Sequence, residues 1–118
     1  MRIRIKRVYE DPSRADGYRV LVDRLWPRGL RKEDARLNEW AKDLAPSDEL
    51  RKWFGHEAGK WDEFRRRYRR ELAGKGDDVA ALVHRCPKRT ITLLFAARDT
   101  DRNNAVVLKE VLETRLPE

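Results

Sequence analysis

The sequence predicts a single α/β domain, built on a small, mostly parallel sheet of three or four strands with helices flanking it. Two apolar runs, residues 20–22 and 90–96, are rich in the β-branched and aliphatic side chains typical of strands covered on both faces. Residues 60–72 show the spacing of an amphipathic helix. The 118 residues suffice for one domain, residues 1–118, with a sizeable core.

The N-terminal segment alternates between cationic and apolar side chains. This alternation over residues 2–8 predicts a strand with Ile3 and Ile5 facing inward, and its cationic face is typical of an edge strand. Residues 9–17 contain two turn signals and are short for the crossover that parallel strands usually need. We nevertheless favour parallel pairing of the first two strands, with a wide hairpin as the alternative.

The second strand, residues 18–24, ends in polar side chains. Its apolar run leads directly into Asp23 and Arg24, and Pro27 keeps the preceding residue out of the helical conformation. Because ligands of open α/β sheets bind at the carboxyl ends of the strands, this exit is a candidate site. The alternative interpretation is a structural ion pair between Asp23 and an arginine, which closes the turn.

The middle of the chain contains short elements. Residues 30–35 are expected to form a charged loop or a helical turn, and residues 36–40 a short strand. Ser47 has the side chain of an N-cap, so a brief helix is expected to begin there and to end near Gly55.

The helix predicted over residues 60–72 has two unlike faces, and glycines follow it. Its apolar stripe consists of Trp61, Phe64, Tyr68 and Leu72. Its opposite face carries Arg65, Arg66, Arg67, Arg69 and Arg70.

Two more helices are predicted in the C-terminal third. Asp77 or Asp78 is expected to cap the first of them, which stops before Pro87. After the last strand, Asp101 or Asn103 is expected to cap the final helix. A strand, a polar loop and a helix N-terminus thus follow one another, and the N–H groups of a helix N-terminus suit an anion.

The overall charge favours acidic partners. Lys and Arg number 28 against 21 Asp and Glu, which gives a formal net charge of +7. Charged residues make up 42% of the chain with both signs interspersed, which is also typical of a soluble surface. No stretch approaches the roughly 20 apolar residues of a membrane span, and the N-terminus lacks an apolar signal core. We therefore expect a cytoplasmic protein without a membrane partner.

The sequence predicts no cofactor and no metal site. Cys86 is the single cysteine, which excludes an internal disulfide and a multi-cysteine zinc site; we expect it to be structural rather than nucleophilic. The two histidines are isolated and match no metal-binding spacing. Asp23, Asp99 and Asp101 could together hold Mg²⁺, but helix capping by the last two is the favoured interpretation.

The leading functional hypothesis is a site for a small anionic, phosphate-bearing ligand at the strand ends. If the strands at 18–24 and 90–96 are neighbours, seven polar residues converge: Asp23, Arg24, Arg28, Arg98, Asp99, Asn103 and Asn104. Asp23 and Asp99 are the candidate catalytic acid and base, which would allow hydrolase or transferase activity. The arginines and asparagines are the candidate ligand-binding groups.

Two alternatives belong to other classes of protein. The first is a nucleic-acid-binding protein that uses the arginine-rich helix face, with Arg65, Arg66, Arg69 and Arg70 as its contacts. The second is an interaction module that forms a homodimer through an exposed patch of Trp40, Trp53 and Phe54. The sequence leaves open whether the protein is a monomer or a homodimer.

Several stretches resemble the YeaO-like bacterial proteins, a group within the larger domain-of-unknown-function 488 family. They are residues 18–29 (YRVLVDRLWPRG), 44–56 (LAPSDELRKWFGH), 61–72 and 93–112 (LLFAARDTDRNNAVVLKEVL). The resemblance covers nearly the whole chain in order. It implies a small α/β fold and a cytoplasmic bacterial setting, and it implies no known activity.

The chain departs from this family pattern at two places. Relatives in the wider family often carry Cys-Ala-Glu at the end of the last strand and Cys-His-Arg at the start of the final helix. The matching positions here are Phe95-Ala96-Ala97 and Asn103-Asn104-Ala105. Any thiol chemistry of those relatives therefore lacks its nucleophile in this chain.

Overall fold

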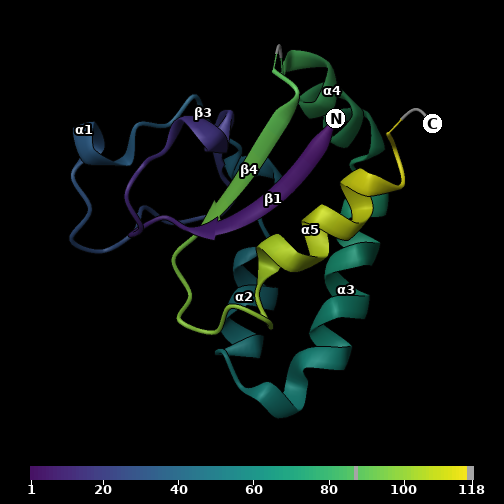
Figure 1. Cartoon of the computed structure of the whole chain (residues 1–118). Helices are drawn as coiled ribbons and strands as arrows, with labels where there is room; N and C mark the ends of the chain where they lie inside the picture. The colour runs from purple at the N-terminus through teal and green to yellow at the C-terminus, as the bar shows by residue number, and fades with distance from the viewer. Residues whose placement is uncertain (87, 117–118) are drawn as a thin grey trace.

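A four-stranded parallel sheet forms the centre of the molecule. The computed structural model describes residues 1–86 and 88–116. Within them the strands are β1 (Arg2–Arg7), β2 (Tyr18–Leu21), β3 (Glu39–Trp40) and β4 (Thr90–Phe95). Their order in the sheet is β1-β4-β2-β3, and every neighbouring pair is parallel (Figure 1). The predicted α/β class with a parallel sheet is confirmed.

The first two strands are parallel, but they do not pair with each other. β4 lies between them, with Ile91 opposite Ile3 of β1 and Leu93 opposite Val20 of β2. The expected direct pairing is therefore wrong, and the hairpin is excluded. The apolar β4 takes a central place because the helices and the loops cover both of its faces, whereas the cationic β1 lies at the edge, as predicted.

Five helices accompany the sheet. They are α1 (Lys32–Ala35), α2 (Asp48–Phe54), α3 (Trp61–Ala73), α4 (Gly76–Arg85) and α5 (Asn104–Glu113), with short 3-10 turns at Arg14–Asp16, Lys42–Leu44 and Ala58–Lys60. In Figure 1, α3 and α5 lie on one side of the sheet and α1 lies on the other. Among the described residues, no helix combines the length and the apolar character needed to cross a bilayer.

The helix caps follow the sequence in two of three cases. Ser47 caps α2 by accepting a hydrogen bond from the Leu50 N–H at 3.1 Å, and Asn103 caps α5 by accepting one from Val106 at 3.2 Å. The expected cap of α4 by Asp77 or Asp78 is wrong, because the helix already begins at Gly76. Both aspartates instead occupy its first turn, where a carboxylate still favours the positive end of the helix dipole. The expected stop at Pro87 lies outside the described residues.

The main core lies between the sheet and helices α2 to α5. On α3, Phe64, Tyr68 and Leu72 are buried as the stripe predicts, and Trp61 packs against them partly buried. Each such side chain contributes about 1.5–3 kcal/mol by leaving water. The predicted exposed patch is wrong at Phe54, which is 4% exposed and stacks on Phe64 with ring centroids 4.2 Å apart. Cys86 is buried, as a structural residue would be.

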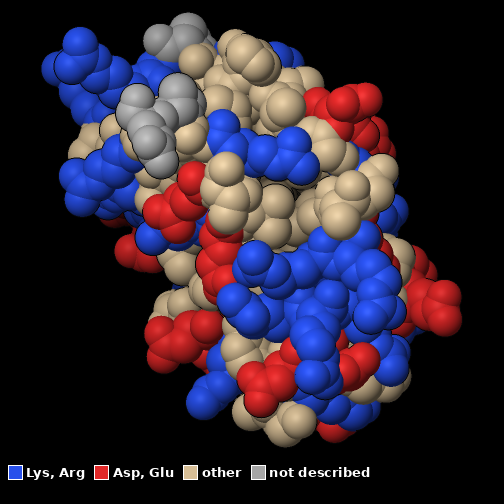
Figure 2. All heavy atoms as spheres, turned by 90° about the vertical axis from the view of Figure 1, so that its right-hand side faces the viewer, with Lys and Arg blue, Asp and Glu red and all other residues tan. Residues whose placement is uncertain are grey.

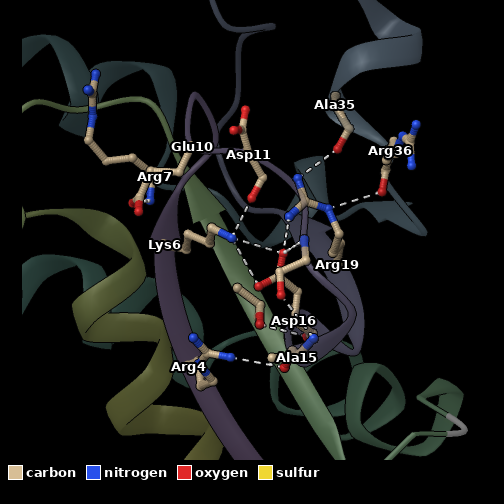
Figure 3. Close-up of polar contacts among 12 residues, drawn as sticks. Arg4, Lys6, Arg7, Glu10, Asp11, Ala15, Asp16, Arg19, Ala35 and Arg36 are labelled. Atoms are coloured by element: carbon tan, nitrogen blue, oxygen red, sulfur yellow. Dashed lines mark hydrogen bonds and ion pairs between the residues drawn. The ribbon is translucent and has the colours of Figure 1, made fainter.

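The opposite face of the sheet carries a buried ionic cluster, which we call the Asp16 cluster: Asp16, Arg19 and Lys6 (Figure 3). The Asp16 carboxylate accepts hydrogen bonds from Lys6 Nζ at 3.1 Å, from Arg19 at 2.5 Å and from the Ser13 N–H at 3.0 Å. The Arg19 guanidinium also donates to two backbone carbonyls of the segment around α1. The cluster therefore ties β1, β2 and the α1 segment together.

Gly17 is required beside this cluster. Its φ of +65° favours glycine, and a Cβ atom there would lie 2.2 Å from the Thr90 carbonyl oxygen of β4. Any side chain at this position would push β2 away from β4.

Candidate anion-binding pocket

A pocket of about 610 Å³ opens at the carboxyl ends of β2 and β4. Residues from three segments line it: 23–28 after β2, 46–56 around α2, and 96–104 from the end of β4 to the start of α5, together with Tyr9 and Phe64. The two strand ends are neighbours, as expected: the Val22 N–H donates to the Leu94 carbonyl at 3.0 Å. The pocket thus lies where ligands of parallel sheets bind.

Asp23 holds the two strand ends and α5 together. Its Oδ2 accepts a hydrogen bond from the Ala96 N–H at 3.0 Å, and its Oδ1 accepts one from Asn104 Nδ2, also at 3.0 Å. Asn104 Nδ2 donates in addition to the Val22 carbonyl at 2.9 Å. These contacts place the first residue of α5 directly against the end of β2.

The Asp23 carboxylate has no cationic partner in the described part of the chain. The predicted alternative, an Asp23–arginine pair that closes the turn, is therefore not formed there. Burial raises the pKa of Asp23, and the hydrogen bonds from Asn104 and Ala96 oppose this effect only in part. A carboxyl group with a raised pKa thus lies in a pocket wall that also holds arginines.

Four arginines line the same pocket. The sequence predicted Arg24, Arg28 and Arg98, and the structure adds Arg51 of α2. Arg24 donates through Nε to the Pro46 carbonyl at 2.9 Å, which joins the exit of β2 to the start of α2. Arg28 and Arg98 are exposed, and within residues 1–86 and 88–116 their side chains form no hydrogen bond or ion pair.

Arg51 has one nitrogen with a hydrogen-bond partner and another without one in the described chain. Its guanidinium donates to Asp48 at 2.6 Å on the surface. Its Nε is buried and has no hydrogen-bond partner among the described residues. A buried donor without a partner costs about 1–3 kcal/mol of stability.

Asp99 and Asn103 line the pocket, but their polar atoms serve the loop before α5. Asp99 Oδ1 accepts from the backbone N–H groups of Asp101 and Arg102 at 2.9 and 3.0 Å, and these bonds lower the pKa of Asp99. Asn103 is buried and donates through Nδ2 to the Asp99 carbonyl while its Oδ1 caps the helix. Asn103 therefore caps α5, whereas the expected capping by Asp99 and Asp101 is wrong: the Asp99 carboxylate closes a turn of the loop before the helix, and Asp101 donates its backbone N–H to that turn.

The sequence interpretation missed Arg51, His56 and the apolar walls of the pocket. Arg51 lies in a short charged helix whose position depends on how α2 packs against α3, and no local pattern reports that packing. His56 follows the C-cap Gly55 and has a φ of +59°, a conformation that the sequence alone does not predict. Among the described residues, no three His, Cys, Asp or Glu side chains gather closely enough to hold a metal ion.

The arginine face of α3 lies elsewhere on the molecule and is largely paired. Arg65 and Arg69 both form ion pairs with Glu110 of α5. Arg66 and Arg67 form ion pairs with Glu63, whereas Arg70 has no ion pair within residues 1–86 and 88–116. Figure 2 shows this gathering of Lys and Arg with Asp and Glu side chains beside and within it.

Trp53, on the same side of the molecule, is covered by cationic side chains. Cationic groups of Arg67 and Lys60 lie over the Trp53 ring, 4.4 and 5.1 Å from its centroid. The face is therefore not an open platform on which bases could stack.

Comparison with known proteins places the chain in a family. Residues 2–118 match the family model DUF488-N3i, which is described as the inactive DUF488-N3 subclade. The chain belongs to the DUF488 family. It is 45% identical over 114 residues to the Escherichia coli protein named "Uncharacterized protein YeaO", a match that spans 97% of this chain and 99% of that protein.

A second group of relatives comes from mycobacteria. "Uncharacterized protein Rv3073c" of Mycobacterium tuberculosis and "Uncharacterized protein Mb3100c" of Mycobacterium bovis are each 45% identical over 114 residues, 97% of this chain and 96% of theirs. The resemblance to the YeaO-like proteins is thereby confirmed. No solved structure matches the chain.

Proposed function

We propose that this protein binds a small anionic, phosphate-bearing ligand in the pocket at the ends of β2 and β4, and that it does so without turning the ligand over. One observation carries the proposal: four arginines line a single pocket at the carboxyl ends of the strands. Guanidinium groups form planar forks that match the oxygens of phosphate and carboxylate.

The charge balance of the pocket supports an anion. Against the four arginines, of which Arg51 is paired with Asp48, stand two lining carboxylates, Asp23 and Asp99. Asp99 already accepts hydrogen bonds from two backbone N–H groups and forms an ion pair with Arg102, so little of its charge is left for a ligand. Asn104, the first residue of α5, also lines the pocket, which places the positive end of a ten-residue helix beside it.

Binding without turnover is favoured by what the pocket lacks. The two cysteines of the wider family pattern match Phe95 and Asn103 in this chain, so neither thiol is available here. The lowered pKa of Asp99 makes it a weak proton acceptor, which leaves Asp23 without a partner for acid–base catalysis. The family description, which calls the subclade inactive, agrees with this proposal.

Thermal unfolding in the presence of phosphate or sulfate tests the proposal. A ligand that binds only the folded chain stabilises it by about 2.7 kcal/mol at 100 times its Kd. We expect the Arg28→Ala/Arg98→Ala double variant to lose most of this stabilisation. The matched control is Arg31→Ala/Arg89→Ala, which removes two exposed arginines that do not line the pocket. Equal responses in the two double variants would contradict the proposal.

A further inference from the structure

We infer that the ligand of this pocket is an aromatic anion, a flat apolar ring joined to a phosphate or carboxylate group. The inference rests on the proposed anion site and names the chemistry of the rest of the ligand. It follows from the apolar side chains that share the pocket with the arginines.

Aromatic side chains alternate with the arginines along the same segments. Trp26 lies between Arg24 and Arg28 in the exit of β2, and all three line the pocket. On α2, Phe54 lies three residues after Arg51 and therefore shares its face of the helix. A ligand held by these cations is thus within reach of an aromatic wall.

The polar atoms of Trp26 and Tyr9 already have hydrogen-bond partners within the protein. Trp26 Nε1 donates to the Leu30 carbonyl at 2.7 Å, and the Tyr9 hydroxyl donates to the Arg28 carbonyl at 2.8 Å. Phe54 and Phe64 stack on each other and are buried, so they lie behind the wall of the pocket as a fixed apolar layer. Contacts of a ligand with these rings are therefore apolar rather than hydrogen-bonded.

The size of the pocket fits a ring better than a lone oxyanion. Its volume of about 610 Å³ lies within the usual range for pockets that bind drug-sized organic molecules, roughly 300–1,000 Å³. An inorganic phosphate would leave the apolar wall in contact with water. A ring attached to the anion would cover that wall and gain the free energy of apolar burial.

Titration calorimetry with two matched ligands tests the inference. Methyl phosphate and phenyl phosphate carry the same anionic group and differ in the ring. We expect phenyl phosphate to bind about tenfold more tightly or better, as stacking on aromatic side chains usually provides. Ribose 5-phosphate against a nucleoside monophosphate, and acetate against benzoate, then distinguish a phosphate-bearing from a carboxylate-bearing source.

Trp26→Ala should erase the advantage of the ring while leaving the binding of methyl phosphate in place. The matched control is Trp53→Ala, because Trp53 is also partly buried but does not line the pocket. Equal affinities of phenyl and methyl phosphate for the wild type would overturn the inference and leave the anion site standing. An undiminished ring advantage in Trp26→Ala would also overturn it, and failure of both phosphates to bind would remove the anion site itself.

Discussion

An aspartate lies near each end of β2, and the two aspartates differ in the partners of their carboxylates. Asp16, just before the strand, is fully buried and accepts hydrogen bonds from two cations and a backbone N–H. Asp23, just after the strand, accepts two neutral hydrogen bonds, and no cation of the described chain pairs with it although arginines line the same pocket. The Asp16 carboxylate is thus paired with cations, whereas the Asp23 carboxylate lies beside arginines that it does not pair with, in the pocket of the proposed anion site.

The two carboxyl groups also differ in pKa. Burial acts to raise the pKa of Asp16, but hydrogen bonds from Ser13, Lys6 and Arg19 outweigh it and hold the pKa below the ordinary 3.8. Burial raises the pKa of Asp23, and its neutral partners do not offset this. The Asp16 carboxyl group thus belongs to a closed ionic cluster, whereas the Asp23 carboxyl group has a raised pKa in the pocket that we propose binds an anion.

The largest effect is expected at the closed end of the strand. Asp16→Ala leaves Arg19 buried without its counter-charge, so the free energy of unfolding should fall by about 3–5 kcal/mol in urea titrations. Asp48→Ala, which removes an exposed partner of Arg51, is the control and should cost less than about 1 kcal/mol. Equal losses in the two variants would show that the Asp16 cluster stabilises no more than a surface ion pair.

At the open end, the expected effect is on affinity. Once the falling pH protonates Asp23, which its raised pKa places at a higher pH than for an ordinary aspartate, sulfate should bind about tenfold more tightly. Asp23→Asn should bind sulfate with an affinity that changes little with pH. The measurement uses a His56→Gln background, because His56 lines the same pocket and its charge acts on Asp23. A pH profile that is the same in both proteins would exclude Asp23 from the pocket's electrostatics.

A smaller effect should distinguish the two aspartates in stability. Asp16, with its lowered pKa, contributes stability that is complete above about pH 4 and is lost as the pH falls through its folded pKa. Asp23, with its raised pKa, favours folding when protonated, and this contribution is lost as the pH rises through its folded pKa. As the pH rises from 3 to 7, the loss of unfolding free energy in Asp16→Asn relative to wild type should therefore grow, and the loss in Asp23→Asn should shrink. Chemical unfolding at several pH values would check the opposite signs.

The smallest effect is expected on the arginine face of α3. Arg66→Glu/Arg70→Glu alters the charge far from the pocket, so phosphate affinity should change less than about twofold. If the wild type binds short DNA and this variant does not, the nucleic-acid alternative is favoured instead. Gel shifts at two salt concentrations would measure it.

Local sequence patterns predicted the elements of this fold better than their arrangement. The strand at 90–96 and the caps at Ser47 and Asn103 depend on neighbouring residues, and each was visible in the chain. The place of β4 between β1 and β2 depends on which strand has both faces covered, a tertiary property. The Asp16 cluster was missed for the same reason, because Lys6 and Arg19 lie on different strands.

The gathering of polar residues at the strand ends was predicted in part. The exit of β2 and the loop before α5 were expected to converge, and they do, because parallel strands end at one edge of the sheet. Arg51 could not be predicted, because it lies on α2, and the position of α2 depends on its packing against α3. The engagement of Asn103 and Asp99 with their own loop also requires the folded backbone.

The most direct test of the account is an amide chemical-shift map of the wild-type chain during titration with phosphate. The account predicts saturable shifts in residues 23–28, 46–56 and 96–104, the three segments that line the pocket, with little change in α3 beyond Phe64. Shifts that cluster on Arg65 to Arg70 instead, or no saturable shifts at all, would contradict the claim that the open end of β2 is an anion-binding site.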